Sequence, residues 1–370
     1  MKTPSTKFKL MALLVGAILG VGLTATNAQA NNHLQSLPGS QFEIDTNANL
    51  IVDGPLTLDW ANVQNDPKYS DQADLPTGKT DDSFVGGTKE DTENPNTTTG
   101  SIPNNKSDLL KFGAYQEGTA FLHLYWSRVQ NPSGTTLMDF EFNAGDLGFI
   151  NGFAVRAPGD LLVEYKLAQG GTKPQLFLYE WLTAAAQGSC EASNTYPCWG
   201  NKMDLSAAGI ATGSINTSSA DASSIGLGSL DPFTFGEASI DLSQIFPEGE
   251  CRSFGSAYLK SRSSDSFTAQ MKDFIAPTDV NISNCATITI IKQDDTPEPD
   301  GPKALAGAVF ALYKDNGNTA DKFDGDDEFV EECVTLSNGT CTFEDKLAGD
   351  YCVVETTPPP GHSLPAPPAD

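Results

Sequence analysis

Short apolar runs separated by turn-forming residues recur along the chain and constrain its fold more than any other feature. The clearest are FLHLYW (121–126), LMDFEFN (137–143), DLLVEYKL (160–167) and QLFLYEW (175–181). Each run is rich in aromatic or branched residues, and glycine, proline, asparagine or serine stands between them. This pattern is typical of short strands in antiparallel β proteins. We therefore predict an all-β fold, in which residues 31–285 form a large β-sandwich or jelly roll.

The first thirty residues have the pattern of an export signal. Three lysines precede an apolar stretch over residues 10–23, and the small-residue sequence Ala-Gln-Ala follows at 28–30. This order is typical of a secretory signal peptide of the bacterial type. A membrane anchor would need a longer apolar span. We expect residues 1–30 to be removed and the mature protein to be secreted to the cell surface.

The net charge excludes some classes of partner. The chain carries a formal charge of −26. Such a surface repels nucleic-acid phosphates and anionic lipids, so we expect no nucleic-acid partner. No later stretch is apolar enough to cross a bilayer, so we expect no membrane insertion of the mature chain.

Cysteines are numerous for a chain of this kind, with seven in 370 residues. Close spacing in an exported protein suggests disulfides, and no Cys-x-x-Cys pattern indicates zinc or redox chemistry. We expect Cys190 to pair with Cys198, around a short loop. We expect Cys251 to pair with Cys285, across the end of the large sandwich.

Motifs of common enzymes are missing from the sequence. His33, His123 and His362 do not have a zinc-binding spacing, and there is no Gly-x-Ser-x-Gly elbow, P-loop or dinucleotide fingerprint. The 48 acidic residues make any choice of a glycosidase pair arbitrary. We therefore expect no enzymatic activity.

A carbohydrate-binding or carbohydrate-active domain on a stalk is the alternative function. Tryptophans can line a sugar platform, although aromatic residues in alternating strands are more often part of a core. The residues in question are Trp60, Trp126, Trp181 and Trp199.

Two long segments contain few large apolar residues. Residues 65–106 predict a solvated acidic loop, and residues 206–229 predict a surface excursion. For the first segment the alternative is calcium binding, because calcium prefers hard oxygen ligands. The carboxylates that it would use are Asp81, Asp82, Glu90 and Asp91.

The last part of the chain carries the most specific motifs. They are TITIIKQDD (287–295), LAGAVFALY (305–313), NGTCTF (338–343), LAGDYCVVE (347–355) and ETTPPPGH (355–362). Residues 286–370 thereby resemble the prealbumin-like, SpaA-like or collagen-adhesin B-type domain of bacterial surface proteins and pilins. The resemblance implies a second, small β-sandwich.

Lys292 and Glu355 are the candidate reactive residues of this domain. Side chains alternate along a strand, so Lys292 shares a face with Ile288 and Ile290, and Glu355 shares one with Tyr351. Burial in a common core favours the neutral forms of both groups. The resemblance implies that the lysine forms an intramolecular isopeptide bond with an asparagine or aspartate, promoted by the glutamate. The alternative is a plain salt bridge between the two residues.

The bond partner of Lys292 does not follow from the sequence. In the resembled family the acceptor lies on the last strand, whereas no asparagine follows Glu355 here. We therefore expect the domain to be incomplete at its C-terminus, with the acceptor and a cell-wall anchor beyond residue 370.

An Asn-Gly turn at 338–339 predicts a hairpin that brings Cys333 and Cys341 together. We expect these two to pair and Cys352 to be the odd thiol, although a bond from Cys352 to either remains an alternative.

Between the strands of this domain lies an acidic insertion, residues 315–328. It is either a solvated loop or a calcium site, and no other cofactor is expected. The calcium ligands would be Asp315, Asp321, Asp324 and Asp326.

Together these features predict a non-enzymatic bacterial surface protein that acts as a structural stalk or adhesin. Its partner would be a host or matrix protein, or a glycan.

Overall fold

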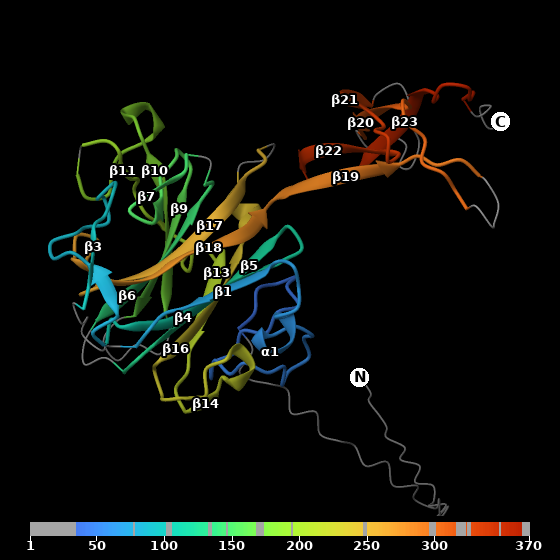
Figure 1. Cartoon of the computed structure of the whole chain (residues 1–370). Coiled ribbons are helices and arrows are strands. Elements are labelled where there is room, and N and C mark those ends of the chain that lie inside the picture. Colours follow the sequence, from blue (N-terminus) through green and yellow to red (C-terminus); the bar gives the residue numbers. More distant parts are fainter. Residues whose placement is uncertain are drawn as a thin grey trace, which may run out of the picture.

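The described chain folds almost entirely as antiparallel β-strands, as predicted (Figure 1). The computed structural model describes residues 35–76, 78–100, 106–131, 135–145, 147–167, 174–193, 195–246, 250–295, 301–315, 323, 327–347 and 349–364. The predicted export signal lies outside these residues. We call residues 35–284 the large sandwich and residues 285–364 the small β-unit.

Two sheets form the large sandwich. The first has the strand order β1 (Tyr69–Ala73), β4 (Leu109–Glu117), β5 (Phe121–Arg128), β16 (Phe235–Asp241) and β13 (Ala211–Ile215). The second has the order β11 (Cys198–Trp199), β10 (Gln175–Leu182), β9 (Leu161–Leu167), β6 (Thr136–Asn143), β17 (Ser253–Arg262) and β18 (Met271–Ser283), with β12 (Met203–Asp204) paired to β10. All the strand pairs of both sheets are antiparallel.

Short elements connect or flank the two sheets. The helical ones are α1 (Trp60–Val63), η1 (Ala185–Gln187), η2 (Ser223–Ile225) and η3 (Leu242–Gln244). The short strands are β2 (Asp82–Phe84), β3 (Thr97–Thr99), β7 (Phe149–Ile150), β8 (Phe153–Ala154), β14 (Ala220–Asp221) and β15 (Ser229–Leu230).

Strand alternation places the main core between the sheets. Along β6, Met138, Phe140 and Phe142 belong to a cluster that also contains apolar residues of β4, β5, β9, β16 and β17. The intervening Asp139 and Glu141 belong to the opposite face and are equally buried. The second sheet is therefore covered on both faces.

An ionic network fills that opposite face of the second sheet. Nζ of Lys260 lies 2.6 Å from Glu90 and 2.5 Å from Glu141, and Arg156 also pairs with Glu141 at 2.7 Å. On the same sheet, Arg262 pairs with Asp139 and Glu164. Burial opposes ionisation of Glu141, yet Arg156 and Lys260 lower the pKa of its carboxyl. Such a network is stable only when every charge has its partner.

The predictions for the two long polar segments are wrong in part. The segment 65–106 contributes β1, β2 and β3, and it buries Asp81, Phe84 and Glu90. The segment 206–229 contributes β13 to the first sheet and buries Ile215 and Ile225. A polar composition predicts solvent exposure, but Phe84 packs against β8, β17 and β18, and Glu90 pairs with Lys260 of β17.

The small β-unit contains two sheets with a core between them. One pairs β19 (Cys285–Ile291) with β22 (Thr340–Leu347), and the other has the order β21 (Glu328–Val334), β20 (Val309–Lys314), β23 (Tyr351–Thr357). Its buried core consists of Ala308, Phe310, Leu312, Cys341 and Phe343.

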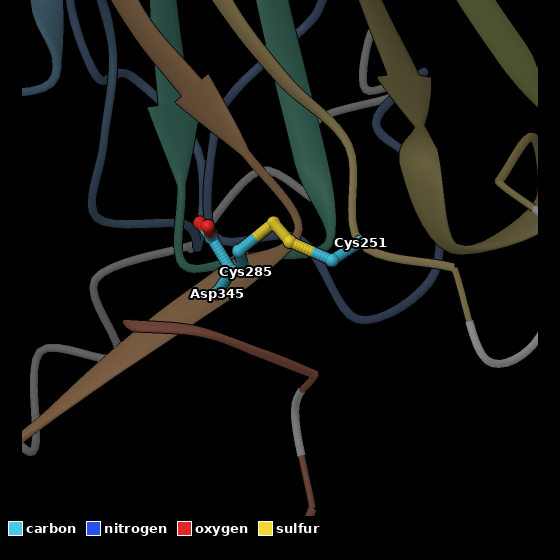
Figure 2. Close-up of side chains that lie close together, drawn as sticks. All are labelled: Cys251, Cys285 and Asp345. Carbon is cyan, nitrogen blue, oxygen red and sulfur yellow. A yellow bond between two sulfur atoms is a disulfide. The ribbon is translucent and has the colours of Figure 1, made fainter. Parts of the chain in front are cut away.

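The connection between the large sandwich and the small β-unit is held by hydrogen bonds and a disulfide. Only Asn284 separates β18 from β19, and its side chain accepts from the Arg252 amide at 2.6 Å and donates to the Glu250 carbonyl at 2.8 Å. A disulfide joins Cys251 to Cys285 beside Asp345 of β22 (Figure 2). The first strand of the small β-unit is thus tied to the large sandwich by covalent and polar contacts.

Within the described residues, no helix has the length and apolar character needed to cross a membrane.

Candidate functional site

Lys292 lies directly after β19, where the chain leaves the sheet. Its backbone amide donates to the Gly339 carbonyl at 2.8 Å, and its own carbonyl accepts from Leu305 at 3.0 Å. These contacts with the turn between β21 and β22 and with the segment before β20 fix the backbone on both sides. Ile288 and Ile290 pack against the core of the small β-unit, as the alternation predicted, and Ile291 is exposed.

Glu355 lies in β23, opposite Phe310 of the middle strand β20. Because β19 and β23 belong to different sheets, the glutamate reaches Lys292 across the core between them. Its Oε2 accepts from Nζ of Lys292 at 2.9 Å, while its Oε1 is buried with no hydrogen-bond partner. One carboxylate oxygen thus holds the amine, and the second is available for another polar group.

The surroundings of the pair differ from the dry interior that the sequence suggested. The lysine side chain is 27% exposed and the glutamate side chain 12%. Val353, which strand alternation places on the same face as Glu355, is also exposed. The pair lies at the rim of the small core, where water still reaches the ammonium.

All three predicted disulfides are present. They are Cys190–Cys198, Cys251–Cys285 and Cys333–Cys341. Cys352 lies in β23, outside these three bonds. A carboxylate oxygen of Asp345 lies within 4.8 Å of the sulfurs of Cys251 and Cys285. Those sulfurs are bonded to each other, so they are not thiolate ligands for a metal.

The expected calcium loop of the small β-unit is largely outside the described residues. Asp321, Asp324 and Asp326 belong to that part of the chain. Asp315 is described, and its backbone amide donates to the Asp350 carbonyl at 3.0 Å.

The acidic residues of the segment 81–91 are divided between two environments. Glu90 pairs with Lys260, and Asp91 accepts from the backbone amide of Trp199 at 3.0 Å. Asp81 instead lies beside Asp74 and Asp273. The four residues therefore do not form a common site.

A tryptophan platform for sugars is not present. Trp60, Trp126, Trp181 and Trp199 are all buried, so none offers an exposed ring face. His123 is also buried, where it stacks on Phe42 at 4.1 Å and bonds to Glu117. The aromatic residues of the large sandwich thus serve its cores.

Two clusters of carboxylates were missed from the sequence. One contains Asp74, Asp81 and Asp273, and the other contains Glu43, Asp45 and Asp53. The first cluster joins residues that are far apart in the chain, so no local sequence pattern predicts it. The second has a local signal in DTNANLIVD (45–53), where oxygen-bearing side chains stand at positions 45, 47 and 49 and again at 53.

Comparison with known proteins identifies the small β-unit. The family model of the SpaA prealbumin-like fold domain matches residues 286–369. This part of the chain is similar to that domain, and we refer to it below as the SpaA-like domain. No curated protein matches the chain.

Two solved structures are similar to the chain at low scores. The crystal structure of the group B streptococcus pilus 2b backbone protein has a TM-score of 0.25 and 13% identity, covering 69% of this chain and 86% of that one. Domains D2 and D3 of the major pilin SpaD from Corynebacterium diphtheriae give 0.20 and 13%, covering 78% and 86% respectively. At these scores neither structure supports an argument about function.

Proposed function

We propose that the chain is an exported bacterial surface protein whose SpaA-like domain serves as a covalently closed module of a stalk or adhesin. The observation that carries this proposal is the contact between Lys292 and Glu355, placed in a SpaA-like domain. The task is structural rather than catalytic turnover. It would present the large sandwich away from the cell, toward a host or matrix protein or a glycan.

The chemistry of the pair suits amide formation. Glu355 accepts a proton from the ammonium of Lys292, which leaves a neutral amine as nucleophile. The amine nitrogen then bonds to the side-chain carbonyl carbon of an asparagine or aspartate. The carbon–nitrogen or carbon–oxygen bond of that side chain breaks as Glu355 returns its proton to the leaving nitrogen or oxygen. The attacking nitrogen gives up its second proton through the glutamate, so an asparagine releases ammonium and an aspartate carboxylate releases water. The second oxygen of Glu355, which has no partner, is suited to contact the acceptor.

The disulfides support the same structural task. Cys333–Cys341 links β21 of one sheet of the small β-unit to β22 of the other, whereas the sequence predicted a hairpin between these two strands. Cys251–Cys285 fixes the start of β19. Covalent links restrict the unfolded chain and thereby stabilise the folded one. An isopeptide bond between the first strand and a later strand would add a constraint of the same kind.

Intact-mass measurement of the protein purified from its native host tests the proposal. The expected mass is lower than that of the processed chain with its disulfides by one ammonia or one water, and a branched tryptic peptide contains Lys292. The Glu355→Gln variant should have the mass of the chain without the cross-link, and its Lys292 peptide should be linear. Glu331→Gln is the matched control, because Glu331 pairs with Lys346 at 2.7 Å in the same β-unit without a role in the bond. A linear Lys292 peptide in the wild-type protein would overturn the cross-link.

A further inference from the structure

Three aspartates of the large sandwich meet in a buried cluster. Asp74 follows the edge strand β1, Asp81 precedes β2, and Asp273 lies in β18. Each offers a carboxylate oxygen to a group whose atoms lie within 4.8 Å of one another. Asp81 is 1% exposed and Asp273 is 0% exposed, so the carboxyl groups of these two residues are shielded from water.

The oxygens of this cluster lack partners. Oδ2 of Asp74, both oxygens of Asp81 and Oδ1 of Asp273 are buried without a hydrogen bond. The other oxygen of Asp273 accepts from the Leu109 amide at 2.7 Å, which fixes the direction of the side chain. A buried carboxylate oxygen without a donor costs free energy, so four of them in one place point to a missing positive partner.

Nearby charges increase that cost. Burial, and then the negative charges of Asp74 and Asp81, raise the pKa of Asp273 to about 9. Burial and neighbouring aspartates likewise raise the pKa of Asp74 to about 7. Among the described residues, no lysine, arginine or histidine forms an ion pair with the three carboxylates.

We propose that Asp74, Asp81 and Asp273 bind a calcium ion. Calcium takes six to eight oxygen ligands and accepts irregular arrangements of carboxylates, whereas magnesium requires a strict octahedron and keeps most of its water. The ion would pin the segment between β1 and β2 to the start of β18. It would thereby tie an edge strand of the first sheet to the second sheet.

Calcium titration of the full chain by calorimetry, after removal of metal with EDTA, tests this site. Asp81→Asn is the informative variant, because neither oxygen of Asp81 accepts a hydrogen bond that the change would disturb. It should bind one calcium ion fewer than the wild type. It should also melt at a higher temperature than the wild type in EDTA, because one buried negative charge has been removed.

The matched control is Asp279→Asn, on the exposed part of the same strand β18, which should bind as many ions as the wild type. Equal calcium stoichiometry in wild type and Asp81→Asn would overturn the site, and so would a wild type that binds no calcium at about 1 mM, an extracellular concentration.

A second site is indicated by a separate observation near the start of the sandwich. Glu43 is 1% exposed, and its Oε1 has no hydrogen-bond partner, while its Oε2 accepts from the amides of Asp53 and Gly54. A carboxylate oxygen of Glu43 lies within 4.8 Å of those of Asp45 and Asp53. Glu237 is also buried, and its Oε1 has no hydrogen-bond partner.

The local sequence matches part of a calcium loop. Asp45, Asn47 and Asn49 have the spacing of the first three side-chain ligands of an EF-hand, although Leu50 replaces the glycine that follows them. The amide nitrogen of Asn49 donates to oxygens of Asp45, Asn47 and Asp53, each at 3.1 Å. The oxygens of Asp45, Asn47 and Asp53 thus converge on one point, where a cation would take the place of the Asn49 amide nitrogen.

We infer that this loop binds a second calcium ion. Asp45→Asn should remove one bound ion in the same titration and leave the site at Asp81 intact, and the double variant with Asp81→Asn should lose both. The inference fails if Asp45→Asn binds as many ions as the wild type.

Discussion

Nζ of Lys292 lies 2.9 Å from Oε2 of Glu355, although the two residues are 63 positions apart in the chain. The contact joins the end of the first strand of the SpaA-like domain to its last described strand. The contribution of this contact to stability depends on whether the two side chains remain an ion pair or whether the lysine goes on to form a covalent bond.

As an ion pair, this contact should contribute little to stability. A partly exposed pair is worth about 0 to 1 kcal/mol, because water screens it and both side chains lose freedom. Lys292→Met in the 370-residue chain should therefore change the free energy of local opening by no more than about 1 kcal/mol. Hydrogen exchange of the β19 and β23 amides measures this change. A much larger loss would indicate that the lysine has a further partner.

Loss of the disulfide at the junction should destabilise the chain far more. The chain-entropy model gives about 4 kcal/mol for closing a loop of this size, in which Cys251 and Cys285 are separated by 34 positions. Changing both to serine should lower the unfolding free energy by roughly that amount. Urea unfolding followed by tryptophan fluorescence reports it, because all four tryptophans lie in the large sandwich. The matched control, Cys190→Ser with Cys198→Ser, opens a loop of only 8 positions and should cost less.

Breaking the buried ionic network should be severe. Lys260→Met leaves Glu90 and Glu141 without their shared cation, and removing one partner of a buried pair costs about 3 to 5 kcal/mol. The added variant Glu90→Gln removes one of the stranded charges. The double variant should therefore be more stable than the sum of the two single effects implies. Thermal unfolding of the three variants checks this, and simple additivity would contradict the coupling.

His123 should make stability depend on pH. Burial lowers the pKa of its imidazole below the usual 6.5, with Glu117 acting in the opposite direction. The unfolded chain therefore binds the proton more readily, so the stability from the neutral ring is present above pH 6.5 and is lost as pH falls through the folded-state pKa. The stability advantage of the wild type over His123→Phe should shrink between pH 7 and pH 5.

Urea midpoints at several pH values measure that difference. The exposed His362 supplies the control, since His362→Gln should keep the pH slope of the wild type. A pH-independent difference between wild type and His123→Phe would show that the ring does not titrate in this range.

The strands of the large sandwich were predictable because each carries its own local signal. The run 121–126 became β5, and 175–181 became β10, with ends shifted by only one or two residues. The run 137–143 became β6, but its local signal could not show what covers each face. Asp139 and Glu141 there meet buried cations rather than water.

The sites were predictable to a lesser degree. Lys292 and Glu355 could be paired because motifs of the SpaA-like domain fix their strands. Asp74, Asp81 and Asp273 could not, because sandwich topology brings three separate segments together there. The segment 65–106 was expected to be solvated on composition alone, and composition does not report that Asp81 and Glu90 are buried by neighbouring strands.

The position of Cys285 has a consequence for the order in which the protein matures. Cys251 precedes β17, but its partner comes only after β18, as the first residue of β19. During synthesis the thiol of Cys251 can find its partner only after the chain has been made through β18, the last strand of the large sandwich. Formation of this disulfide then fixes the first residue of the SpaA-like domain against the large sandwich. Oxidation of the two thiols therefore follows synthesis of the large sandwich and fixes where the next domain begins.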